Sequence, residues 1–172
     1  MLTEAKFLER LIKDLLELSK LQSLEFKIEK SDVSINKIID EVVRSAKKIS
    51  KDTKIEIDVN KSVDDIKISG DYHRLRQMFM IILDNAIKFS NYGDRVSINI
   101  SKNKLTINDE GIGIFKEDIP YIFERFYQSR YENNKTGTGL GLAIAKKIAD
   151  RHDIKLKVES ERNVGSSFIF NF

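Results

Sequence analysis

Apolar residues recur every three or four positions in four stretches of the chain, and this spacing predicts four amphipathic helices. The stretches are residues 5–22, 34–46, 71–89 and 140–152. The stripe of the first helix consists of Leu8, Leu11, Ile12, Leu15, Leu18 and Leu21. Its length favours packing in a helical bundle, and packing on the chain's own domain is the alternative. Ser31, Asp32 and Ser34 are candidate caps for the second helix.

Alternation of apolar and polar residues, strict at residues 54–60 and weaker at residues 65–70, and further apolar-rich stretches predict six β-strands between and after these helices. They are expected at residues 54–60, 65–70, 95–101, 104–109, 154–160 and 166–172. Residues 116–128 resemble a short helix with Pro120 in its first turn. Most neighbouring strands are joined by hairpins, whereas a doubly wound fold needs helices between them. The order therefore predicts a two-layer α/β sandwich, in which helices cover one face of a mixed sheet.

Composition narrows the class of protein. The 172 residues suit one domain, and 41% hydrophobic residues are enough for a core. The net charge of +3 comes from intermixed charges without a basic block, which argues against nucleic acid as the main partner. No apolar run is long enough to span a bilayer, no signal peptide is recognisable, and cysteine is absent. We therefore expect a soluble, intracellular segment without membrane contact of its own.

Three clusters of residues are candidates for chemistry. Gly137, Gly139 and Gly141 open the last helix, where backbone amides can face an anion; a tight turn before a helix is equally compatible. Asp109 ends a strand and precedes Gly111 and Gly113; an ordinary Asp-Gly turn is the simpler explanation of this cluster alone.

The third cluster lies at the end of the helix predicted over residues 71–89. The amide oxygen of Asn85 is a suitable Mg²⁺ ligand, Lys88 can meet a phosphate as a point charge, and Phe89 can pack on a base. Each residue alone also has an ordinary structural explanation at a helix end. The order of the three clusters, about 25 residues apart, is more specific than any one of them.

The three clusters and a fourth motif resemble the catalytic, ATP-binding domain of sensor histidine kinases. This domain belongs to the wider superfamily of gyrase, heat-shock chaperone, histidine kinase and mismatch-repair ATPases. The matching stretches are DYHRLRQMFMIILDNAIKFS (N box), NDEGIGI (G1), YIFERFYQ (F box) and TGTGLGLAIAKKIADRH (G2). The terminal GSSF is similar to the family's last strand, and residues 1–25 resemble the second helix of its dimerisation and phosphotransfer hairpin. Residues 26–172 would then form the Bergerat-type catalytic domain.

The resemblance implies a role for each matching residue. Asn85 would ligate Mg²⁺, Lys88 would reach the phosphates, and Phe89 would pack on the adenine. Asp109 would accept a hydrogen bond from the adenine N6 amine, with Ser167 nearby through water. The remaining assignments are Gly111 and Gly113 at the base, Gly137, Thr138, Gly139, Leu140 and Gly141 at the phosphates, and Arg125 at the γ-phosphate. Phe123 and Phe126 would fix the short helix to the core, and residues 127–137 would form a lid.

The sequence departs from the family pattern at three places. Ile81 stands where hydrolytic relatives carry a carboxylate that activates water, which argues against a dedicated ATPase and fits phosphoryl transfer. His152-Asp153-Ile154 replaces a His-Gly-Gly turn. Neither histidine of the chain has the sequence context of the family's phosphoacceptor. His73 and His152 both lie in predicted helices, where a structural role is expected.

The resemblance implies a kinase fragment that transfers phosphate from ATP to a histidine on a dimerisation and phosphotransfer domain. Its implied partners are ATP, Mg²⁺, that domain and a response regulator, and its implied location is the cytoplasmic part of a membrane-bound sensor. Two alternatives stay open at this stage. One is an anti-sigma-type serine kinase on the same fold, and the other is a nucleotide-binding regulatory or scaffolding module without transfer.

Overall fold

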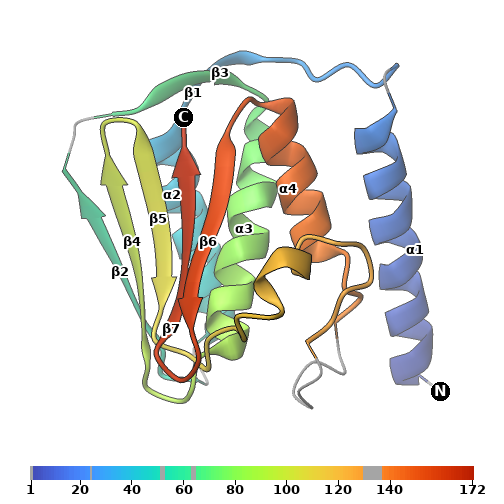
Figure 1. The fold of residues 1–172 in the computed structure, drawn as a ribbon. Coiled ribbons are helices and arrows are strands. Elements are labelled where there is room, and N and C mark those ends of the chain that lie inside the picture. Colours follow the sequence, from blue (N-terminus) through green and yellow to red (C-terminus); the bar gives the residue numbers. More distant parts are fainter. Residues whose placement is uncertain (1, 24, 51–52, 63–64, 130–136) are drawn as a thin grey trace.

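The computed structural model describes residues 2–23, 25–50, 53–62, 65–129 and 137–172 (Figure 1). The helices are α1 Leu2–Gln22, α2 Ile35–Ile49, α3 Tyr72–Phe89 and α4 Gly141–Arg151. The strands are β1 Ser31–Ser34, β2 Glu56–Lys61, β3 Lys67–Gly70, β4 Arg95–Ser101, β5 Lys104–Asp109, β6 Lys155–Glu161 and β7 Gly165–Asn171. All four helices and all six strands expected from the spacing of apolar residues are therefore present.

Five strands form one mixed sheet in the order β2-β4-β5-β7-β6, in which β2 and β4 are parallel and the other pairs antiparallel. Figure 1 shows α2, α3 and α4 together on one side of this sheet. The apolar side chains between the layers form a single core, with the ring of Phe79 on α3 edge-on to Phe170 on β7 at 5.0 Å. The predicted two-layer α/β sandwich is confirmed.

The opposite face of the sheet is polar because side chains alternate along each strand. Asn108 on β5 donates to Ser97 Oγ at 3.2 Å and accepts from Ser167 Oγ at 2.6 Å. The neighbouring register pair, Asp109 and Ser166, points to the helical side instead. This alternation decides which of two adjacent serines reaches the site described below.

Strand β1 is the one element that the apolar pattern did not indicate. It pairs antiparallel with β3 in a separate two-stranded sheet, with Val33 opposite Ile68. Ser34, one of three candidate caps, ends this strand and caps α2, since its Oγ accepts from Lys37 N–H at 3.1 Å. Val33 is the one apolar residue of this strand, so its sequence shows no alternation, whereas Ile66 and Ile68 alternate at β3.

The helix expected over residues 116–128 was wrong in extent. Only the 3₁₀ turn Ile119–Tyr121 forms, with Pro120 near its start as expected. Phe123 packs partly against the core, but Phe126 is 55% exposed and has a φ of 60°. The expectation that Phe126 fixes this segment to the core was therefore also wrong.

Helix α1 lies beside α4 (Figure 1) and is only half covered. Leu18 and Leu21 are buried against the domain, whereas Leu8, Ile12 and Leu16 are exposed. Polar contacts add to this packing: Glu17 pairs with Arg74 on α3, and Asp14 binds Thr138. Part of the stripe thus packs on the chain's own domain, and the bundle boundary at residue 25 stays a prediction. None of the described helices is long and apolar enough to cross a bilayer.

His152 has the structural role that was expected of it. It is buried at the end of α4, where Nδ1 donates to the Ile148 carbonyl at 2.7 Å and Nε2 accepts from Asp71 N–H at 3.0 Å. These bonds require a neutral ring, and burial lowers the pKa of His152 accordingly.

Candidate functional site

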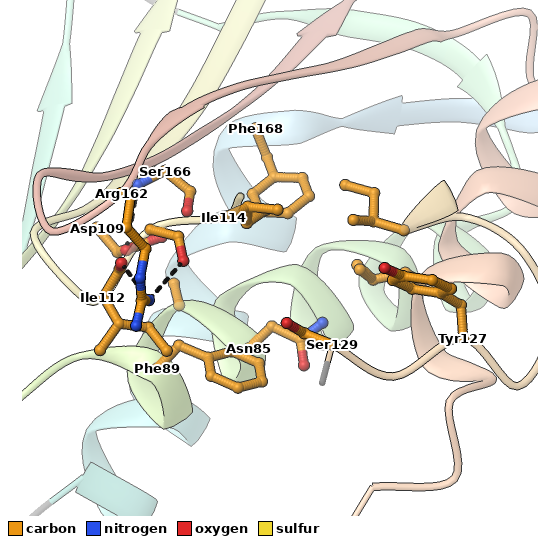
Figure 2. Close-up of a pocket in the computed structure, with 14 residues that line it drawn as sticks. Asn85, Phe89, Asp109, Ile112, Ile114, Tyr127, Ser129, Arg162, Ser166 and Phe168 are labelled. Carbon is orange, nitrogen blue, oxygen red and sulfur yellow. Dashed lines mark hydrogen bonds between the residues drawn. The ribbon is translucent and has the colours of Figure 1, made fainter. Parts of the chain in front are cut away.

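Two adjoining cavities open where α3, α4 and the segment after β5 meet. Figure 2 shows the first, an apolar cavity of about 790 Å³ including its open mouth. The second is more polar, encloses about 1280 Å³ by the same measure, and extends to α1. The described residues that line both are Asn85, Phe89, Ile122, Tyr127 and Leu142. Asn85 and Phe89, predicted as site residues, therefore lie at the junction of the cavities.

Asp109 is the one carboxylate among the described residues that line the first cavity. Its side chain is 8% exposed, and Oδ1 accepts from the N–H groups of Gly111 at 3.0 Å and Ser166 at 3.3 Å. Burial raises the pKa of Asp109 from 3.8 to about 6, against the lowering effect of these two hydrogen bonds. The carboxylate is thus held in a fixed position on the apolar wall of the cavity, where it can accept a further hydrogen bond.

Glycines let the backbone beside Asp109 approach its neighbours closely. A Cβ on Gly111 would lie 2.8 Å from the carbonyl carbon of Phe89, and one on Gly113 would lie 2.8 Å from that of Glu161. Gly113 also has a φ of +65°, a left-handed conformation that favours glycine. Gly113 lines the cavity itself, whereas Gly111 tightens the turn behind it.

The structure corrects one predicted residue of this cavity. Ser167 lies on the open face of the sheet, bonded to Asn108, and does not line either cavity. Ser166 takes the place expected for Ser167, because neighbouring residues of a strand point to opposite faces. Counting the alternation of β7 from buried Phe168 would have identified Ser166 from sequence.

Arg162 and several apolar residues were also missed. Figure 2 shows Arg162 beside Asp109 and Ser166 at one end of the cavity, and Tyr127 at the other end. Arg162 donates to the Ile112 carbonyl at 2.7 Å and stacks on Phe115, with 4.6 Å between guanidinium and ring centre. It is a hairpin residue in the turn ERNVG, where no motif draws attention to it.

The second cavity collects the glycines and the basic residues. Gly137, Gly139 and Gly141 line it, together with Lys88 of α3 and with Arg10 and Lys13 of α1. Gly139 has a φ of +72° and packs against the backbone of Phe126, where a Cβ would lie 2.8 Å from its carbonyl carbon. Partial burial and the charge of Arg10 lower the pKa of Lys88. Such a glycine-lined, cationic cavity suits an anion.

Helix α4 begins at this cavity without a side-chain cap. Leu140 occupies the N-cap position and makes no capping hydrogen bond, unlike Ser34 and Asp71 at α2 and α3. The first N–H groups of α4 are therefore left for another partner, and a helix N-terminus favours an anion. The side chain of Leu140 itself is fully buried in the core, so its predicted contact with a ligand can come only from the backbone.

The other residues predicted at the phosphates lie as follows. Thr138 is buried and its hydroxyl donates to Asp14 Oδ2 at 2.7 Å, a contact between the glycine loop and α1. Ile81 lines the second cavity, and a Cβ added to Gly141 would lie 3.4 Å from the Ile81 side chain. Arg125 is exposed in a separate groove and lines neither cavity. Residues 130–136 of the predicted lid lie outside the described part of the chain.

The two cavities together have the layout of a nucleotide site. The first cavity is apolar and has one buried carboxylate, which suits a base that carries an amine. The second cavity is lined by cations and backbone amides, which suits phosphates. Asn85 places an amide oxygen between them, although no cluster of three or more acidic, His or Cys metal ligands occurs among the described residues. The two cavities thus bring together residues from each of the three clusters that the sequence analysis selected.

Comparison with known families agrees with this layout. Residues 70–172 match the family described as histidine kinase-, DNA gyrase B- and HSP90-like ATPase. The chain belongs to this ATPase family. The matched range contains all three clusters that the sequence analysis selected, so the predicted resemblance is confirmed.

Individual members of the family are similar over nearly the whole chain. Sensor histidine kinase YkoH of Bacillus subtilis is 36% identical over 99% of the chain, which spans 37% of that relative's length. Among solved structures, full-length ShkA in complex with AMPPNP has a TM-score of 0.84 at 26% identity, covering 95% of this chain and 35% of that one. The complex of histidine kinase ThkA with the response regulator TrrA shares the fold at 24% identity, with a TM-score of 0.75 and coverage of 97% and 47%.

Proposed function

We propose that this chain is the ATP-binding catalytic part of a sensor histidine kinase, and that it transfers the γ-phosphate of ATP to a histidine of a dimerisation and phosphotransfer domain. The observation that carries the proposal is the buried Asp109 carboxylate in an apolar cavity that continues, past Asn85, into the glycine-lined cationic cavity. The relatives named above as sensor histidine kinases support the same assignment.

The adenine would occupy the first cavity. Asp109 Oδ1 accepts from two backbone N–H groups and the Ser166 side chain also hydrogen-bonds to this carboxylate, which would accept from the N6 amine. Phe89 and Ile112 supply apolar surface to the ring, and Ser166 replaces Ser167 as the serine of this wall. The site would therefore select a base with an exocyclic amine over one with a carbonyl group there, since a carboxylate accepts hydrogen bonds and cannot donate to a carbonyl.

The triphosphate would lie in the second cavity, against Gly137–Gly141 and Lys88. Asn85 would hold Mg²⁺ through its amide oxygen, a donor of the kind that this ion prefers and one that lies between base and phosphates. The ion would supply neutralisation of phosphate charge. Arg125 would reach the γ-phosphate only after a rearrangement of residues 122–129, because it lines neither cavity.

The proposed reaction is phosphoryl transfer, not hydrolysis. The γ-phosphorus loses its bond to the bridging oxygen, ADP leaves, and a phosphorus–nitrogen bond forms with the acceptor imidazole. Ile81 lines the phosphate cavity and offers no base to activate water there. The enzyme's contribution is positioning and charge neutralisation. A response regulator would take the phosphate next, in a cytoplasmic setting.

A transfer experiment tests the proposal. The chain is mixed with labelled ATP, Mg²⁺ and a separate dimerisation domain that carries the acceptor histidine, alongside the same domain with His→Gln. We expect acid-labile label on the histidine-bearing domain only. Acid-stable label on serine would favour the anti-sigma type of kinase, and nucleotide binding without label would favour a regulatory module.

Replacing Asn85 by Ala tests the metal assignment. We expect Mg²⁺ to strengthen binding of a fluorescent ATP analogue to the wild type, and this increment to fall about tenfold or more in Asn85→Ala. Binding without metal should change little, because the base cavity is kept. Asn103→Ala, an exposed substitution in the β4–β5 turn away from both cavities, is the control. An unchanged Mg²⁺ increment in Asn85→Ala would remove Asn85 as the ligand.

A further inference from the structure

Helix α1 contributes charge to a cavity that otherwise belongs to the catalytic domain. Lys13 and Asp14 lie three and four residues after Arg10, so each lies on the same face of α1 as Arg10. All three line the second cavity, opposite Lys88 and the glycine loop. None of the sequence motifs includes them.

The position of this face is set by specific contacts. Asp14 Oδ2 accepts from Thr138 Oγ1 at 2.7 Å, which ties α1 to the glycine loop at the mouth of the cavity. One turn further, Glu17 pairs with Arg74 on α3, and Leu18 and Leu21 are buried in the core. These contacts hold α1 at the cavity, so Arg10 and Lys13 are held there too.

Two carboxylates, Asp14 and Asp84, share this cavity with Arg10 and Lys13 in the described part of the chain. Neither Arg10 nor Lys13 forms an ion pair there, although Lys30, Lys61 and Lys146 each have a carboxylate within 4 Å. Arg10 also lies close enough to Lys88 for its charge to lower the pKa of that lysine, while Asp84 acts in the opposite direction. Three basic residues and two carboxylates line the second cavity, and Asp14 is already bonded to Thr138, so an anion that binds there would meet a net positive charge.

From this arrangement we infer that Arg10 and Lys13 complete the phosphate subsite and make α1 a sensor of the phosphate chain: they bind the β- and γ-phosphates and contribute nothing to the base. The inference rests on the proposed nucleotide site. It assigns to the N-terminal helix a direct part in nucleotide selection, so that ATP favours the docked position of α1 more than AMP does. Loss of the γ-phosphate would weaken this docking.

Parallel titrations of the whole chain with fluorescent analogues of ATP and AMP test the inference. In the double variant Arg10→Gln/Lys13→Gln we expect ATP affinity to fall about tenfold or more, and AMP affinity to change less than about twofold. The salt dependence of ATP binding should also become shallower, because two ionic contacts are lost. Both positions are exposed on a helix, where Gln is a good helix former, so the fold should be kept.

Lys20→Gln is the matched control, since it removes one charge from α1 two turns beyond Lys13 and outside the cavity. Equal losses of ATP and AMP affinity in the double variant would overturn the inference, because they would mean that α1 acts through the fold. Unchanged ATP affinity would overturn it while leaving the nucleotide site intact. If the wild-type chain binds neither nucleotide, the proposed function fails and the inference with it.

Discussion

Asp109→Asn should weaken nucleotide binding about a hundredfold or more while making the nucleotide-free protein more stable. The nucleotide loses its acceptor, because the substituted amide presents N–H groups to the N6 amine, and a buried donor facing a donor is costly. The fold gains, because burial disfavours the charged carboxylate and raises its pKa to about 6. Asn keeps the oxygen that accepts from Gly111 and Ser166. Above pH 6 we expect a gain of about 1–3 kcal/mol in the free energy of unfolding.

The raised pKa makes both the stability of the fold and the nucleotide affinity depend on pH. Because the pKa of Asp109 is raised on folding, the folded chain binds more protons than the unfolded chain between about pH 4 and 6. The contribution of this group to stability is therefore present below that window and is lost as the pH rises to 6. Nucleotide affinity should show the opposite trend and fall as Asp109 is protonated below about pH 6.

Titration calorimetry and denaturant unfolding, run at pH 5 and pH 8, measure both effects. In Asp109→Asn the difference between the two pH values should shrink for binding and for stability alike. Asp32→Asn, an exposed carboxylate on β1 that forms no ion pair with the described residues, is the matched control and should change neither. An Asp109→Asn protein that is less stable and still binds the nucleotide would show that the carboxylate is structural.

The limits of prediction from sequence lie in the residues without a periodic signal. Helices α2, α3 and α4 and the long strands could be predicted, since their apolar residues repeat at the spacing of the element. Strand β1 contains a single apolar residue, Val33, and the segment around Phe126 turns through a positive φ, so local pattern carried too little information in both places. The same holds for the turn that places Arg162.

Residues that line the cavities could be identified where the residue type itself is informative but not where orientation decides, and the roles assigned to them stay predictions. Asn85, Asp109 and Gly113 are unusual residues at their places in the chain, and they line the cavities. Ser166 and Ser167 differ only in which face of β7 they occupy, and this depends on the register with β5. Leu140 is buried because α4 turns it to the core, which a glycine motif does not indicate.

Gly113→Ala should unfold or severely destabilise the chain, by about 2–4 kcal/mol, and should abolish nucleotide binding at a temperature where the wild type is folded. Two costs combine at this position. The backbone has a φ of +65°, which an L side chain rarely adopts, and the new Cβ would lie 2.8 Å from the carbonyl carbon of Glu161 and closer still to its oxygen. Relief requires the segment after β5 to move away from the β6–β7 turn, which opens the first cavity, since Gly113 lines it.

Gly93→Ala separates the two costs. Gly93 has a similar positive φ of +83°, but a Cβ there would meet nothing within 4 Å. It should therefore lose only about 1 kcal/mol, through backbone strain, and keep nucleotide affinity. Thermal unfolding of the two variants, with and without the ATP analogue, gives the comparison. Equal losses of stability and nucleotide affinity in the two variants would contradict this prediction. The close approach of residue 113 to the β6–β7 turn would then not hold the first cavity closed. The position of Asp109 would depend on its hydrogen bonds to Gly111 and Ser166 alone.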